Sequence, residues 1–291
     1  MYDQILFPTD GSEPAESALE YALEVATEHD ATLNILNVAD TTRDSLTQIR
    51  GEVVDALEQE GERIVEEAAE RARERDISVT TATVQGVPSS SIGEYSDRIG
   101  VDLIVMATHG RKGLKRALIG SVTERVVRTA EVPVITISPR SERRGRYPCE
   151  NLLVPIDGSS GADAALRSGI AIAERTDTTL HLLYVVETAS LGLDARSILQ
   201  QKELTAQANE TLEAATARAS DSVDVIESQV VAGTPAKEIR RYIQENDIGL
   251  AVLGTHGETD FSRYMLGGVS SKLIRSAEIP VMWTRSDDAT T

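Results

Sequence analysis

The chain has 291 residues, 41% of them apolar, and its 47 acidic against 29 basic residues leave a net charge of −18. This length predicts about two domains, and the composition excludes a disordered chain. No apolar run approaches the roughly 18 residues of a transmembrane helix, and no signal peptide is recognisable. The single cysteine, Cys149, excludes a disulfide framework. We therefore expect a cytoplasmic protein without membrane contact.

The negative charge disfavours a nucleic-acid partner, because phosphate backbones are repelled by an acidic surface. The chain has only five lysines, so most of its basic residues are arginines. A high acidic load with few lysines is typical of proteins from salt-loving organisms, in which salt screens the self-repulsion. The alternative is an ordinary acidic protein tuned for solubility, and the salt dependence of stability separates the two.

Strands and helices alternate along the first half of the chain. Gln4–Pro8 is a short buried strand, and Glu13–His29 places alanine and leucine at helical spacing, with Ser12 as its expected N-cap. Further strands are expected at 31–38, 77–85, 103–107 and 132–137, and further helices at 45–75, 88–99 and 120–129. Such alternation predicts a parallel sheet with helices on both faces, the doubly wound α/β fold.

The second half repeats the first at a constant offset of 147 residues. Pro8 and Asp10 fall on Pro155 and Asp157, and the Thr-His-Gly triplet at 108–110 falls on 255–257. We infer an internal duplication, with domains at 1–139 and 149–286, an arginine-rich linker at 140–148 and a flexible tail at 287–291.

The candidate chemistry lies after the strands, because ligands of doubly wound sheets bind beyond the carboxyl ends of strands. Asp10 and Asp157 follow the first strand of each copy and could accept hydrogen bonds from a ligand, although capping of the next helix is the alternative. Gly110 and Gly120 follow the fourth strand, and the second of them opens a helix, where backbone N–H groups favour an anion. Together they predict a triphosphate cradle, with a pair of unliganded tight turns as the alternative.

Both halves resemble the universal stress protein family over nearly their whole length. The family signature, Gly-x2-Gly-x9-Gly-Ser/Thr, corresponds to Ala107, Gly110, Gly120 and Ser121 in the first copy, and to Gly254, Gly257, Gly267 and Gly268 in the second. The resemblance implies two tandem Rossmann-like domains, each with a five-stranded parallel sheet, that bind ATP or a related adenine nucleotide at the strand ends. A magnesium ion on the phosphates would accompany the nucleotide.

The resemblance also indicates which residues contact the nucleotide. In the first copy these are Pro8, Thr9, Asp10, Val38, Met106, Ala107, His109, Gly110, Gly120, Ser121, Val122 and Thr123. In the second copy they are Pro155, Ile156, Asp157, Val185, Leu253, Gly254, Gly257, Gly267, Gly268, Val269 and Ser270. The aspartate and the valine would lie by the adenosine, and the glycine clusters would hold the phosphates. Neither a metal site nor a catalytic set is expected, and His109 and His256 are expected to shape their loops by hydrogen bonding.

Neither copy matches the signature fully. Ala107 replaces the first glycine, which matters only if that position needs a positive φ. Gly268 replaces the serine or threonine, and Ser270 could supply the hydroxyl only by a different geometry. The loop at 111–116 carries four cations near the expected phosphates, whereas the loop at 258–263 carries two anions and one cation. We therefore expect the first copy to bind ATP more tightly than the second.

These features favour a tandem universal stress protein in which ATP acts as a regulatory ligand with little or no turnover, because no base is evident to position an attacking water. Two alternatives are a non-nucleotide protein-interaction module of the same fold and an enzyme, such as a slow ATPase or a nucleotidyl transferase. The resemblance further implies that the last strands, 132–137 and 279–284, pair the two copies into an internal pseudo-dimer. Whether tandem chains assemble further into a homodimer is left open by the sequence.

Overall fold

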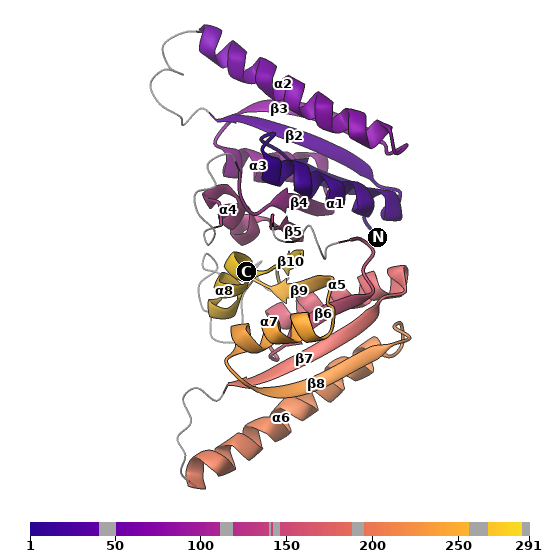
Figure 1. Cartoon of the computed structure of the whole chain (residues 1–291), viewed down its shortest axis with the longest axis vertical. Coiled ribbons are helices and arrows are strands. Elements are labelled where there is room, and N and C mark those ends of the chain that lie inside the picture. The colour runs from indigo at the N-terminus through magenta and orange to yellow at the C-terminus, as the bar shows by residue number, and fades with distance from the viewer. Residues whose placement is uncertain are drawn as a thin grey trace. The chain divides into compact units, whose positions relative to one another are not determined.

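The computed structural model describes residues 1–40, 51–110, 119–139, 141, 146–187, 195–255 and 267–286 (Figure 1). The chain divides into two compact units, Met1–Tyr147 and Pro148–Thr291. The expected tail at 287–291 and residues 140 and 142–145 of the expected linker lie outside the described residues.

In each unit, described strands and helices alternate. The first unit contains β1 (Gln4–Pro8), α1 (Glu13–His29), β2 (Thr32–Asp40), α2 (Gly51–Arg73), β3 (Val79–Gly86), α3 (Pro88–Ile99), β4 (Leu103–Ala107), α4 (Ser121–Thr129) and β5 (Val134–Ile137). The second contains β6 (Asn151–Ile156), α5 (Ser160–Thr176), β7 (Thr179–Glu187), α6 (Ala195–Ala219), β8 (Ile226–Gly233), α7 (Pro235–Glu245), β9 (Leu250–Gly254), α8 (Gly268–Ser276) and β10 (Val281–Thr284).

The strand order in the first unit is β3-β2-β1-β4-β5, and in the second unit β8-β7-β6-β9-β10. Every described pair within a unit is parallel. The doubly wound α/β fold predicted from the alternation is thereby confirmed. The strand order reverses between β1 and β4, so the loops that leave these two strands diverge and open a crevice at their carboxyl ends.

The central strands are apolar because both faces of a parallel sheet are covered by helices. Leu6 of β1 and Ile104 of β4 are completely buried. Right-handed crossovers place α1 and α2 on one face of the first sheet and α3 and α4 on the other, and α3 and α4 contact each other. The carboxyl ends of β1 and β4 therefore lie between the two helix layers.

The ends of β2 and β3 differ from the sequence expectation. The strand expected at 31–38 runs from Thr32 to Asp40, because β3 pairs with it as far as Asp40↔Gly86. The partner strand supplies backbone hydrogen bonds that the local sequence does not reveal. The helix expected at 45–75 is described from Gly51 to Arg73. Gly120, expected as the first residue of a helix, is instead the N-cap of α4.

Helix capping differs between the copies. Ser12 occupies the N-cap position of α1 as expected, but its buried hydroxyl has no hydrogen-bond partner. Ser159, at the matching position of α5, accepts a hydrogen bond from the Ala162 N–H at 3.1 Å. The second copy alone therefore uses the serine cap that the sequence predicts for the first.

Tyr147, which the sequence places in the linker, packs into the first unit. Its backbone N–H donates to a carboxylate oxygen of Glu24 at 2.9 Å, and its hydroxyl lies 2.7 Å from Nε2 of His29. Both partners belong to α1, so this end of the linker is anchored on a helix.

Among the described residues, no helix combines the length and apolar character needed to span a membrane.

Candidate functional site

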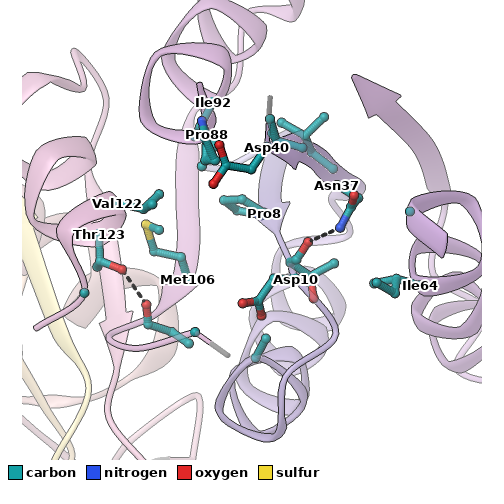
Figure 2. A pocket seen from close by; sticks show the side chains of 18 of the residues that line it. Pro8, Asp10, Asn37, Asp40, Ile64, Pro88, Ile92, Met106, Val122 and Thr123 are labelled. Atoms are coloured by element: carbon teal, nitrogen blue, oxygen red, sulfur yellow. Dashed lines mark hydrogen bonds between the residues drawn. The ribbon is translucent and has the colours of Figure 1, made fainter. Parts of the chain in front are cut away.

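A cavity of about 610 Å³ opens at the strand-order reversal of the first unit. All twelve residues indicated by the sequence for the first copy line it, from β1, β2, β4 and the start of α4. Figure 2 shows Pro8, Asp10, Met106, Val122 and Thr123 gathered around this space. The volume lies within the range of small-molecule sites in proteins, about 300–1,000 Å³.

Asp10 stands at the inner edge of the cavity because β1 ends two residues before it. Its Oδ1 accepts a hydrogen bond from the Ser12 N–H at 3.1 Å, which turns the chain into α1. Its Oδ2 lies against Gly110, where any Cβ atom would overlap it. Gly110 therefore leaves room for the aspartate in its present position and does not serve a left-handed backbone, since its φ is not positive.

The start of α4 forms the opposite side. Gly120 is its N-cap, and the Gly120 N–H donates to the Thr108 carbonyl at 2.8 Å. The Thr123 hydroxyl donates to the Ala107 carbonyl at 2.8 Å and ties the first turn of α4 to the end of β4 (Figure 2). The first N–H groups of a helix have no partners within it, so this turn presents donors and a positive dipole end to an anion.

The first signature position does not need glycine. Ala107 ends β4 with its side chain buried, and it is not among the described residues with positive φ. At the matching position of the second unit, a Cβ on Gly254 would lie 2.6 Å from the carbonyl carbon of Gly161 in α5. Glycine there serves close helix packing, which explains why alanine fits in one copy and glycine is needed in the other.

His109 also lines the cavity, and its Nδ1 lies 2.9 Å from the hydroxyl of buried Thr108. The loop-shaping role expected of His109 stays a prediction. His256, Gly257 and both charged loops, 111–116 and 258–263, lie outside the described residues. The charge difference between those loops therefore stays a prediction.

Several lining residues were missed by the sequence analysis. Asn37 is 6% exposed, and its Nδ2 donates to the Thr9 carbonyl at 2.8 Å, which holds the end of β1. Gly61 of α2 allows this amide to fit, since a Cβ there would lie 2.6 Å from Asn37 Oδ1. Asp40 lines the cavity as well. The available signal was the presence of two polar residues, Asn37 and Asp40, near the end of an apolar strand. No local pattern marked Gly61.

In the second unit the corresponding residues stand at the same strand ends. Pro155 and Ile156 end β6, Val185 lies in β7, Leu253 and Gly254 end β9, and Gly267 to Ser270 form the N-terminus of α8. Asp157 accepts from the Ser159 N–H at 2.9 Å but is exposed, whereas Asp10 is half-buried. The Ser270 hydroxyl donates to the Gly254 carbonyl at 2.9 Å, the bond that Thr123 makes in the first unit. It therefore does not take the place of the hydroxyl missing at Gly268.

The comparisons with known proteins agree with the duplication. Residues 1–138 and 149–285 each match the universal stress protein family model. Universal stress protein Rv2005c of Mycobacterium tuberculosis is 31% identical over 238 residues, covering 78% of this chain and 78% of that protein. Universal stress protein MJ0531 of Methanocaldococcus jannaschii is 34% identical over 146 residues, covering 49% of this chain and 86% of that protein.

A solved universal stress protein from Archaeoglobus fulgidus shares the fold, with a TM-score of 0.76 over 97% of this chain and 98% of that one, at 23% identity. The chain belongs to the universal stress protein family and carries two copies of its domain.

Proposed function

We propose that the first unit binds ATP or a related adenine nucleotide as a regulatory ligand. One observation carries the proposal: a single cavity at the strand-order reversal joins Asp10 to the N-terminus of α4. The carboxylate suits the hydroxyls of a ribose, and the helix N-terminus suits phosphates. Gly110 keeps the space between them free of a side chain.

Magnesium would enter this site with the triphosphate. Within the described part of the chain, no group of three His, Cys, Asp or Glu side chains is placed to hold a metal ion. The phosphates would therefore supply most of the ion's ligands and water the rest, as Mg²⁺ commonly prefers.

We further propose that the first unit binds the nucleotide more tightly than the second. Tyr184 of the second unit stands at the position of Asn37, so the second unit has no asparagine amide that could donate to the backbone carbonyl at the position of Thr9. Gly268 lacks the Ser121 hydroxyl. These differences add to the predicted charge difference between the loops.

Calorimetric titration of ATP and Mg²⁺ into the full chain in molar KCl tests both points. We expect saturable binding with a stoichiometry near one per chain. Gly110→Ala should weaken it about tenfold or more, about 1.4 kcal/mol, because the methyl group displaces Asp10. Gly93→Ala is the matched control, since a Cβ at Gly93 of α3 meets nothing within 4 Å.

The outcomes separate the candidate functions. Absence of heat, together with no competition by other adenine nucleotides, would refute nucleotide binding and favour the protein-interaction module. A stoichiometry of two would overturn the proposed difference between the units. Release of phosphate from labelled ATP that is lost in Gly110→Ala would identify an ATPase instead of a regulatory site.

A further inference from the structure

Strand β2 projects beyond its neighbour at the cavity. The register of β1 with β2 ends at Pro8↔Leu36, yet β2 continues to Asp40 and pairs with β3 as far as Gly86. Four residues of extended chain span about 13 Å. The last part of β2 therefore forms a wall that reaches past the end of β1, on the side away from β4.

Alternation along this wall decides which side chains share a face. Asn37 points toward α2, because its amide oxygen lies against Gly61. Val38 and Asp40 consequently face the other helix layer, where α3 begins with Pro88. Figure 2 shows Asp40 beside Pro88 and Ile92, across from Pro8 and on the opposite side from Ile64.

The cavity thus has two chemically different ends. The N-terminus of α4, with Gly120, favours phosphate. The part of the cavity at β2, which β1 separates from β4, is lined by Val38, and Pro8, Pro88 and Ile92 add apolar surfaces suited to a flat ring. The Asp40 side chain stands at the edge of this part, where β2 ends, and it is half-buried beside Pro88 and Ile92 at the start of α3 (Figure 2).

An ionised carboxylate only accepts hydrogen bonds, so Asp40 selects a ligand group that donates them. With phosphates at α4, the group that reaches this edge is the base, and the donor of adenine is its exocyclic amine. We propose that Asp40 is a specificity-determining residue that accepts a hydrogen bond from the exocyclic amine of the base. This proposal rests on the nucleotide-binding function proposed for the same cavity.

The test compares ATP with purine riboside 5′-triphosphate, which has the same ring, sugar and phosphates but no exocyclic amine. We expect the full chain to bind ATP about tenfold more tightly, the value of one hydrogen bond to a charged group. Asp40→Ala should bring the ratio of the two dissociation constants close to one, and Asp40→Asn should give an intermediate ratio, because the amide oxygen accepts without charge.

The duplication supplies a matched control. Glu187 ends β7 at the position of Asp40, and its side chain is exposed. Glu187→Ala should leave the ratio unchanged. Circular dichroism melts establish that each variant is folded, and Asp40→Asn provides the test if Asp40→Ala does not fold.

Three results are decisive. Equal binding of both ligands by the unsubstituted chain, or a ratio that survives Asp40→Ala, overturns the role of Asp40 while nucleotide binding stands. If Asp40→Ala weakens the binding of both ligands equally, the proposed role of Asp40 is also overturned, since the carboxylate would then act on the sugar, the phosphates or the fold. Failure of the unsubstituted chain to bind ATP overturns the proposed function itself, and the specificity with it.

Discussion

Gly110 and Gly254 belong to the same family signature, yet each leaves room for a different neighbour. Gly110 accommodates a carboxylate oxygen of Asp10, and Gly254 accommodates the backbone of Gly161 in α5. Neither has a positive φ among the described residues. At these two positions glycine therefore allows a close approach, and the neighbour that approaches decides whether alanine is tolerated, as it is at Ala107.

His181 gives a residue-scale prediction about pH. Burial lowers its pKa from the ordinary value of 6.5, against an opposing effect of Glu227. The neutral ring lies 3.0 Å from the Tyr242 hydroxyl through Nδ1 and 3.3 Å from Asn151 Oδ1 through Nε2. Below about pH 6.5 the unfolded chain binds a proton that the folded chain does not. We expect stability to fall as the pH drops from neutral toward the lower pKa of the folded state.

Asn34 provides the control substitution, because it stands at the position of His181 in the first unit and donates to Gln4 Oε1 at 2.9 Å. His181→Asn should reduce the loss of stability between pH 7.5 and 5.5, measured as the shift of the urea midpoint. All other titratable groups are the same in both proteins, so their contributions cancel in the comparison. Equal pH slopes in the two proteins would show that His181 does not contribute.

At the scale of elements, the first helix of each copy begins with an equivalent serine, but only one of the two serine hydroxyls makes a hydrogen bond. Ser159 caps α5 through the Ala162 N–H, whereas the Ser12 hydroxyl at the start of α1 is buried without a partner. Ser159→Ala should cost about 1 kcal/mol, the usual value of a serine cap. Ser12→Ala should cost less, because it removes a buried hydroxyl that makes no hydrogen bond.

Denaturant unfolding of both variants measures this difference within one chain. The matched position and the same substitution make each variant the control for the other. A larger loss of stability in Ser12→Ala than in Ser159→Ala would contradict the capping assignment.

At the scale of the whole molecule, the net charge of −18 predicts salt-dependent stability. Self-repulsion among carboxylates opposes the compact state, and the screening length falls from about 10 Å at 0.1 M to about 3 Å at 1 M salt. The melting temperature should rise steeply between low salt and molar KCl. NaCl at the same ionic strength should act alike, because screening does not depend on the cation, and a flat response would remove the halophilic interpretation.

Elements bounded by strong local signals were predicted to the residue. Glu13–His29 and Pro88–Ile99 each begin beside a proline in the first turn and end at a residue in the left-handed conformation, Asp30 and Gly100. The ends of β2 and β3 were not predicted to the residue, because a strand continues for as long as its partner pairs with it. The paired residues, such as Asp40 and Gly86, are 46 positions apart in the chain.

The sequence alone determined the duplication, the doubly wound fold and the family, since glycine spacing, strand-end aspartates and apolar runs are local patterns repeated at one offset. Only the tertiary structure brought Asn37, Asp40 and Gly61 to the cavity. Their positions depend on strand register and on how α2 and α3 pack against the sheet. Those contacts join residues distant in the chain, so no short stretch of sequence contains them.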